Sequence, residues 1–186
     1  MAFQFKIQLK DIIAPPVWRR LSVPEQFTFY RFHKAIQVAF GWGNTHLFQF
    51  SPGGYNSHPV ITIPNPEWDA EPVLDGKKTR LSDIFSAPKQ KFVYLYDLGD
   101  NWIHTVTLEK ITEEKILRAD CIAGKGACPP EDCGGSWGYT NLKDILCDLQ
   151  HPEYTQMKEW VGLAKSQNWD AEYFNLERTR AAIQRV

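Results

Sequence analysis

Residues 3–10 alternate between hydrophobic and polar side chains. The hydrophobic positions are Phe3, Phe5, Ile7 and Leu9. A period of two is that of a strand with one buried face, so the chain is predicted to open with a strand. The same reasoning predicts further extended segments over residues 17–23, 46–50 and 60–63. Within 46–50, His46 falls on the same side as Phe48 and Phe50.

The pattern then changes to a helical period. Thr28 is a plausible N-cap for a helix over 28–40, and Gly41 is suited to end it. The apolar stripe of this helix consists of Phe29, Phe32, Ile36, Ala39 and Phe40. Three more helical patterns occupy 141–149, 153–165 and 171–185, the last with Asp170 as N-cap. Cys147 falls on the apolar stripe of the first of these, which predicts a buried thiol.

Strands dominate the first two-thirds of the chain and helices the last third. This order predicts an α+β fold with a mostly antiparallel or mixed sheet, a helix near the N-terminus and a helical C-terminal third. The length of 186 residues and the lack of a low-complexity linker predict one domain over residues 1–186.

The strongest hairpin signal lies in "KFVYLYDLGDNWIHTVTLE", residues 91–109. Two alternating runs flank Gly99 and Asp100, a pair suited to a two-residue type II′ turn. That turn would place Asp97 opposite Trp102 and Leu95 opposite His104. Asp97 and His104 would then share one face within side-chain reach.

A second segment rich in functional groups is "ACPPEDCGGSWGY", residues 127–139. We expect it to meet the hairpin tip in a polar concavity. The candidate polar site consists of Asp97, Asp100, His104, Glu131 and Asp132. Carboxylates and imidazole suit zinc, manganese or iron, so a divalent metal is a candidate cofactor, with Asp97, His104 and Asp132 as ligands. Glu131 would then be a general base. The alternative is that these acids only shape turns and that His104 is a core histidine bonded to Asp97.

Cysteine chemistry has weaker support. Six and four residues separate Cys121, Cys128 and Cys133, which matches zinc-binding cysteine pairs poorly. A thiolate of Cys128 or Cys133 with His104 as base is a further alternative, but no established catalytic motif accompanies it. The cysteines are expected to be thiols or ligands and not disulfides.

Charge and aromatic content bear on partners. The 21 basic and 22 acidic residues nearly balance, so charge does not favour nucleic-acid binding. A candidate binding surface consists of Trp18, Arg19, Arg20, Trp42, His46, Trp102 and Trp137. The alternative is that the tryptophans belong to the core. A protein partner or small ligand is therefore favoured over nucleic acid.

No apolar run reaches the roughly 18 residues of a membrane span, and the N-terminal segment lacks the core of a signal peptide. We therefore expect a cytoplasmic protein that is not embedded in a membrane.

Four motifs in order resemble one family. They are "PPVWRRL" (15–21), "FGW" with "HLFQF" (40–50), "YDLGDNWIHTVTLE" (96–109) and "ACPPEDCGG" (127–135). Their order is similar to that of the plasmid pRiA4b ORF-3-like family, and the resemblance covers nearly the whole chain.

The resemblance implies little about activity, because the family is uncharacterised biochemically. Some members are labelled resolvases or adjoin repressor-type DNA-binding domains, but this sequence shows no helix-turn-helix pattern or recombinase nucleophile. Matching positions without an assigned role are Trp18, Arg19, Arg20, Trp42, His46, Asp97, Gly99, Asp100, Trp102, His104, Cys128, Pro129, Pro130, Glu131, Asp132, Gly134 and Gly135. The sequence thus predicts a binding or interaction protein with a polar site formed by 96–104 and 127–139. A metal-dependent hydrolase and a nucleic-acid-associated protein are the alternatives.

Overall fold

The computed structural model of the protein describes residues 1–67, 69 and 71–186. Its strands are β1 (Ala2–Ile13), β2 (Pro16–Pro24), β3 (Phe48–Ser51), β4 (Ile61–Thr62), β5 (Leu74–Asp75), β6 (Lys91–Tyr96), β7 (Trp102–Thr112) and β8 (Asp120–Lys125). Its α-helices are α1 (Phe29–Phe40), α2 (Gly135–Cys147), α3 (Tyr154–Trp160) and α4 (Leu176–Ile183), and a short 3₁₀ helix spans Leu81–Asp83.

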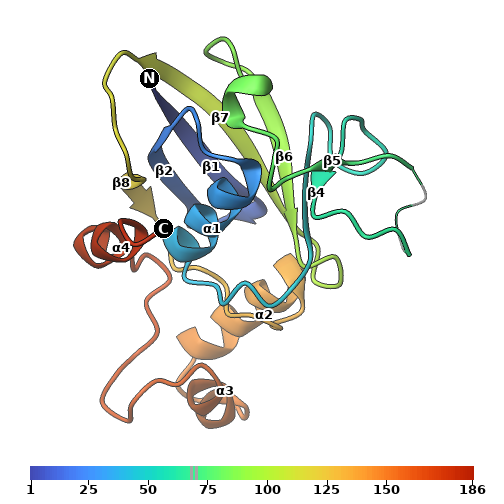
Figure 1. Ribbon diagram of the computed structural model, residues 1–186. Helices are drawn as coiled ribbons and strands as arrows, with labels where there is room; N and C mark the ends of the chain where they lie inside the picture. Colours follow the sequence, from blue (N-terminus) through green and yellow to red (C-terminus); the bar gives the residue numbers. More distant parts are fainter. Residues whose placement is uncertain (68, 70) are drawn as a thin grey trace.

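Among the described residues, the strands form one sheet in the order β5-β4-β3-β6-β7-β1-β2-β8. Neighbouring strands are antiparallel, except that β4 and β5 run parallel. Figure 1 shows α1 lying over the sheet that contains β1 and β2. The mixed sheet and the helices agree with the predicted α+β class. No helix of the described chain is long and apolar enough to cross a membrane.

The core lies between the sheet and α1. Alternation along β1 directs Phe5 toward α1, where its ring centroid lies 4.8 Å from that of Phe32. The Thr28 side chain caps α1 by accepting a hydrogen bond from the Arg31 backbone N–H. Gly41 ends the helix in the left-handed conformation with φ of 93°. These end signals fix where the chain leaves α1 toward β3.

The opposite face of the central strands is polar and partly solvated. Arg20 donates two hydrogen bonds to the carboxylate of Glu109, at 2.6 and 2.9 Å, and Gln4 donates a third at 2.8 Å. The bond from Arg20 lowers the pKa of Glu109. The cationic groups of Lys6 and Arg20 lie over the ring of Trp18. The charge of Arg20 is therefore already paired with a carboxylate on this face.

The C-terminal third is helical, but its helix bounds differ from the prediction. α2 begins at Gly135 and not at residue 141, and Asn175 caps α4 where Asp170 was expected. Cys147 is exposed, so its predicted burial is wrong. The buried face of α2 ends with Leu146, and the next residue is rotated about 100° away from it.

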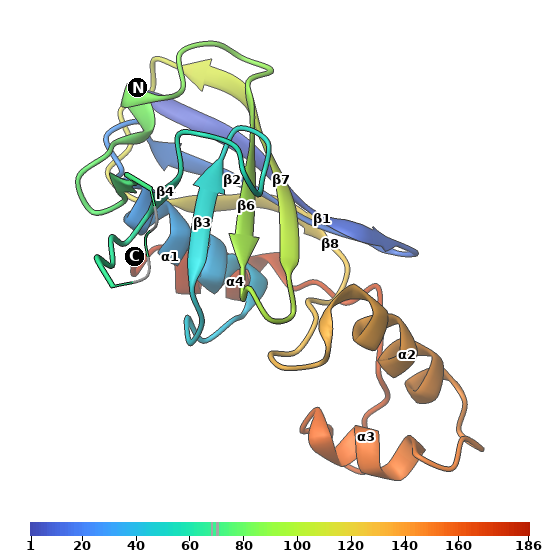
Figure 2. The same ribbon diagram turned by 90° about the vertical axis from the view of Figure 1, so that its right-hand side faces the viewer.

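The C-terminal helices occupy two different places. Figure 2 shows α2 and α3 projecting beyond one end of the sheet, whereas Figure 1 shows α4 beside β8. The loop between β8 and α2 therefore runs from the edge of the sheet toward the end where the β6–β7 hairpin turns.

Candidate functional site

The β6–β7 hairpin closes through a five-residue loop, 97–101, and not through the predicted two-residue turn. Asp97 adopts a left-handed conformation with φ of 53°. Its Oδ1 accepts hydrogen bonds from the backbone N–H groups of Gly99 and Asp100, at 3.0 and 3.2 Å. Aspartate favours such turns because its short side chain bonds the backbone two residues on. This turn leaves Oδ2 of Asp97 to face other side chains.

The longer loop changes the strand register and removes His104 from the site. Tyr94 pairs with His104, where the sequence predicted Leu95, so the expected contact between Asp97 and His104 is wrong. His104 is fully buried, with Nδ1 at 3.2 and 3.1 Å from the carbonyl oxygens of Tyr94 and Trp102. Burial lowers the pKa of His104 to about 3. It is a neutral core histidine, and its Nε2 has no hydrogen-bond partner among the described residues.

The hairpin tip and the loop before α2 lie against each other. Oδ2 of Asp100 accepts a hydrogen bond from the Gly134 backbone N–H at 3.1 Å. Gly135 has φ of 68°, and a Cβ there would lie 2.5 Å from the Asp100 carbonyl oxygen. The indole Nε1–H of Trp42 donates to the Pro129 carbonyl at 2.9 Å, which ties the same loop to the end of α1. Asp100 thus positions the loop.

A buried hydrogen-bond network holds the connection between α1 and β3, which carries His46. The Asn44 backbone N–H donates to Oε1 of Gln37 at 3.0 Å, and Nε2 of Gln37 donates to the Tyr94 hydroxyl at 2.9 Å. His33 links the same groups, with Nδ1 at 2.8 Å from the Tyr94 hydroxyl and Nε2 hydrogen-bonded to Asn44. Burial lowers the pKa of His33 to about 4, so its ring is neutral near pH 7.

Glu131 is oriented by two donors. Its Oε1 accepts hydrogen bonds from the Gly43 backbone N–H at 2.8 Å and from the Tyr96 hydroxyl at 2.9 Å. Burial, together with the bond to this carboxylate, raises the pKa of Tyr96 to about 12, so the phenol remains a donor. With Oε1 fixed in this way, Oε2 of Glu131 points toward His46.

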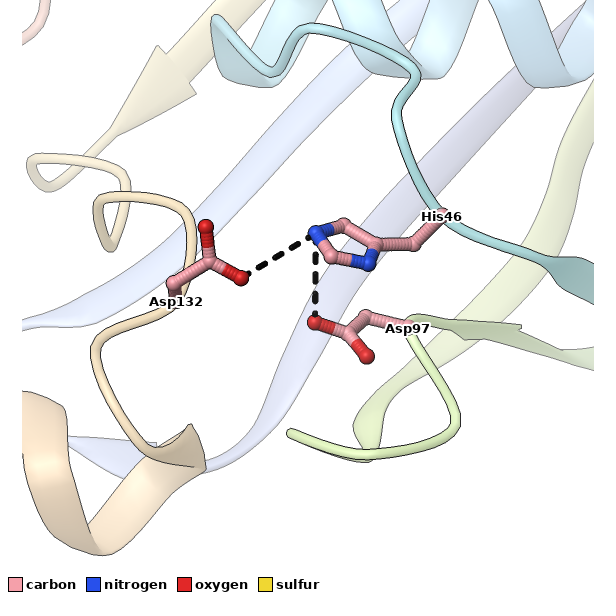
Figure 3. Close-up of side chains that lie close together, drawn as sticks. All are labelled: His46, Asp97 and Asp132. Carbon is pink, nitrogen blue, oxygen red and sulfur yellow. Dashed lines mark ion pairs between the residues drawn. The ribbon is translucent and has the colours of Figure 1, made fainter.

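Three carboxylates converge on one imidazole nitrogen, and we call this set the His46 cluster: His46, Asp97, Glu131 and Asp132. Nε2 of His46 lies 3.3 Å from Oδ1 of Asp132, 3.6 Å from Oδ2 of Asp97 and 3.7 Å from Oε2 of Glu131. Figure 3 shows Asp97 and Asp132 approaching the ring from different directions. They come from the hairpin tip and from the loop before α2.

The His46 cluster carries an excess of acceptors. Nε2 of His46 and Oε2 of Glu131 are buried, and neither forms a hydrogen bond with any residue that the structure describes. A neutral His46 with its lone pair on Nε2 would repel the three carboxylate oxygens. The arrangement therefore requires either a proton on Nε2, which the neutral Nε2–H tautomer can carry as well as the doubly protonated ring, or a cation between these atoms.

Its dimensions match those of a metal centre. One ligand atom each from His46, Asp97 and Asp132 lies within 4.8 Å of the others. Donor atoms bound at about 2.0–2.2 Å to a tetrahedral ion lie roughly 3.3–3.6 Å apart, close to the distances from His46 to its carboxylates. One imidazole with carboxylates is a donor set that suits Zn²⁺, Mn²⁺ or Fe²⁺.

The cysteines do not join this site as reactive groups. Burial raises the pKa of the Cys128 thiol, and it raises the pKa of Cys133 to about 12. A nucleophilic thiolate requires a lowered pKa and a nearby base, whereas His104, the proposed base, is buried in the core. The described cysteines are free, as the sequence predicts.

The structure distributes the other predicted binding residues over separate places. Trp42 and Trp102 are buried in the core, and Trp18 lies with Arg20 on the polar sheet face. Trp137 is 81% exposed on α2. These side chains do not form one continuous platform for bases, sugars or peptides.

The predicted ligands included His104, whereas the structure brings His46 together with Asp97 and Asp132. His46 was placed on a binding surface, but its pairing with Asp97 and Asp132 was not foreseen. One usable signal was its position in 46–50, on the buried side with Phe48. Tyr96 was also missed, because an alternating strand does not show which hydroxyl meets a carboxylate from a distant loop.

Comparison with known sequences assigns the chain to a family. The profile described as "Plasmid pRiA4b ORF-3-like protein" matches residues 1–178. The chain belongs to this family. The pRiA4b ORF-3-like chain is 32% identical over 178 residues to uncharacterized protein y4hQ of Sinorhizobium fredii (strain NBRC 101917 / NGR234). That match covers 93% of the chain and 86% of the relative.

A solved structure is also similar. The crystal structure of MM3350, a protein of unknown function from Methanosarcina mazei Go1, shares 36% sequence identity with a TM-score of 0.80. The match covers 95% of this chain and 96% of the other. The pRiA4b ORF-3-like chain thus shares its fold with MM3350, and neither relative carries an assigned activity in its description.

Proposed function

We propose that this pRiA4b ORF-3-like protein binds a divalent metal ion through the His46 cluster. The ligands would be Nε2 of His46, Oδ2 of Asp97 and Oδ1 of Asp132, with Glu131 as a fourth ligand or the partner of a bound water. The observation that carries the proposal is the convergence of three carboxylate oxygens on Nε2 of His46 at 3.3–3.7 Å.

The hydrogen bonds that orient the carboxylates favour a metal-binding role for these residues over a role in shaping turns alone. Asp97 uses Oδ1 for the hairpin turn, and Glu131 uses Oε1 for Gly43 and Tyr96. In both residues, the second carboxylate oxygen faces His46. Metal ligands are commonly held by outer hydrogen bonds of this kind. Protonation of His46 alone would add one positive charge beside three carboxylates, whereas a divalent cation adds two.

The test is metal content and thermal unfolding of purified, reduced, untagged protein, with Zn²⁺ or Mn²⁺ added back after chelator treatment. A ligand at 100 times its Kd adds about 2.7 kcal/mol, which corresponds to a rise in Tm of roughly 5–10 °C for a chain of this size. One equivalent of bound metal and a reversible rise of this order are expected.

Two variants and one control locate the ion. His46→Gln and Asp97→Asn keep similar side-chain shapes and are expected to abolish the metal-dependent rise in Tm. His58→Gln is the matched control, because His58 pairs with Glu71 at 2.9 Å on a half-exposed surface away from the cluster. Metal binding that survives both cluster substitutions would refute the proposal.

Metal-assisted hydrolysis is a second candidate, favoured by the open side of the cluster. The side chain of Asp132 is 73% exposed, so solvent reaches the ion on that side. Catalytic zinc sites keep such an open position for water or substrate. Metal-dependent cleavage of bis-(4-nitrophenyl) phosphate or 4-nitrophenyl acetate, lost in Asp97→Asn, would support this activity. If the protein binds metal but hydrolyses neither the phosphodiester nor the carboxylic ester, the metal site serves binding and not hydrolysis.

A further inference from the structure

A second site lies away from the His46 cluster, between α1 and the chain that returns to α4. A cavity of about 730 Å³ opens there, within the size range of small-molecule pockets. Its apolar wall consists chiefly of Val38, Phe40, Leu163 and Phe174. The segment after α3 and the helix α4 form the outer side, so sequence positions more than 120 residues apart build one pocket.

Arg19 forms part of the inner wall, although the sequence pattern placed it on an exposed binding surface. Arg19 is only 3% exposed to solvent. The guanidinium donates hydrogen bonds only to main-chain carbonyl oxygens, those of Trp18, Ala39, Lys125 and Gly126. The rings of Phe40 and Phe174 lie 5.1 and 4.3 Å from it. No carboxylate among the described residues forms an ion pair with Arg19.

A buried cation without an anionic partner is unusual, because desolvation of a charge costs far more than neutral carbonyls return. Desolvation also lowers the pKa of Arg19, although the group stays charged near pH 7. The positive potential of this guanidinium therefore acts on whatever enters the cavity beside it.

Two more groups on the cavity wall lack partners. The indole Nε1–H of Trp169 is buried and finds no acceptor within the described part of the chain. Arg178 of α4 also lines the cavity and makes no ion pair with a described residue. Asp170 is the acid on the wall, and its Oδ1 accepts a hydrogen bond from the Glu172 backbone N–H at 2.9 Å. The wall thus carries one net positive charge and one free donor.

From these observations we propose that the cavity binds a small aromatic carboxylate. The carboxylate would form an ion pair with Arg178 and accept a hydrogen bond from Trp169, on the side of the cavity where Arg19 adds positive potential. The aromatic ring of the ligand would pack against Phe40 and Phe174. A monoanion matches the single net charge, whereas the apolar wall excludes a strongly hydrated polyanion. A small ligand is one of the partner classes that the sequence favoured.

Calorimetric titration of the full chain tests this proposal with matched probes. Benzoate, phenylacetate and 1-naphthoate are the carboxylate probes, 1-naphthamide is the neutral isostere, and 1-naphthyl phosphate is the dianion. Saturable binding of at least one carboxylate is expected, with 1-naphthoate binding at least tenfold more tightly than the amide and the phosphate, since hydrogen bonds to charged groups are the stronger ones.

Two substitutions in the cavity wall and one control test whether the ligand binds in the cavity. Arg178→Met removes the exposed cation, and Trp169→Phe removes the donor while keeping an aromatic ring. Each is expected to weaken 1-naphthoate binding about tenfold. Arg185→Met is the control, because this exposed residue of the C-terminal turn does not line the cavity. Retention of wild-type unfolding midpoints shows that the variants remain folded.

The possible outcomes separate this inference from the metal site. No saturable binding of any carboxylate at millimolar concentration would overturn it, as would equal affinity for the amide. Tighter binding of the phosphate would replace the proposed ligand class, and affinity unchanged in both cavity variants would place binding elsewhere. Asp97→Asn, which tests the metal site, is expected to leave 1-naphthoate affinity unchanged.

Discussion

Removal of one hydroxyl tests how the fold supports the His46 cluster. In Tyr96→Phe the ring stays, with its centroid 4.9 Å from that of Trp42. The lost hydroxyl donates to Oε1 of Glu131 at 2.9 Å and accepts from the Thr45 backbone N–H at 3.2 Å. The substitution therefore releases the Glu131 carboxylate from one of its two donors without removing core packing.

The expected loss of stability follows from these two contacts. A hydrogen bond to a charged group contributes about 1.5–3 kcal/mol and a neutral one about 0.5–1.5 kcal/mol. The Glu131 side chain is 24% exposed, so water compensates part of the larger value. We expect the free energy of unfolding to fall by about 2 kcal/mol in total. Metal affinity should fall about tenfold, because outer-shell partners orient metal ligands.

The assay combines urea unfolding, followed by tryptophan fluorescence, with calorimetric Zn²⁺ titration. Tyr139→Phe is the control, since this buried hydroxyl donates to the Ala127 carbonyl at 2.8 Å and does not contact the cluster. It should lower stability by about 1 kcal/mol and leave Zn²⁺ affinity unchanged. If Tyr96→Phe matched wild type in both measurements, the assigned role of Tyr96 in holding Glu131 would be refuted.

Further predictions concern acid stability and the contact between hairpin and loop. His33 and His104 have folded-state pKa values lowered to about 4 and about 3. The unfolded chain therefore binds more protons below pH 6.5, and stability should fall by up to about 1.4 kcal/mol per histidine per pH unit as pH drops from 6 toward 4. Urea midpoints that stay constant from pH 7 to 4.5 would contradict this. Gly135→Ala should destabilise by about 2 kcal/mol or more, because it adds a left-handed alanine and a clash with the Asp100 carbonyl. Gly162→Ala, with φ of 73° and open space around it, should cost only about 1 kcal/mol, and equal losses in thermal or urea unfolding would disprove the packing argument.

Strands and the first helix were readable from the sequence because their signals are local. The alternation that begins at Phe3 matches the buried face of β1, and Thr28 and Gly41 lie at the ends of α1. The strand order was not readable, since it depends on pairing between distant segments. α2 was missed over its first turn because Gly135 and Gly138 resemble loop residues.

The candidate site was predicted in part. The hairpin tip and the loop before α2 do meet, and Asp97 and Asp132 contribute to the same cluster. His104 was expected beside Asp97 because a two-residue turn was assumed, whereas the Asp97 side chain stabilises a five-residue loop. Such a change in loop length shifts the register, so that Tyr94 and not Leu95 lies opposite His104 and Asp97 is no longer paired with Trp102. Only the three-dimensional path of the α1–β3 connection shows that His46 takes its place.

The most direct measurement of metal binding is a long-range ¹H–¹⁵N spectrum of the five histidine side chains, recorded without and with one equivalent of Zn²⁺. If the His46 cluster binds the ion, the Nε2 resonance of His46 shifts to the value of a metal-bound nitrogen, while His104 keeps its resonances. A His46 resonance that is unchanged by Zn²⁺ and responds only to pH would rule out metal binding at His46, because the carboxylates would then surround an imidazole N–H and not a metal ion.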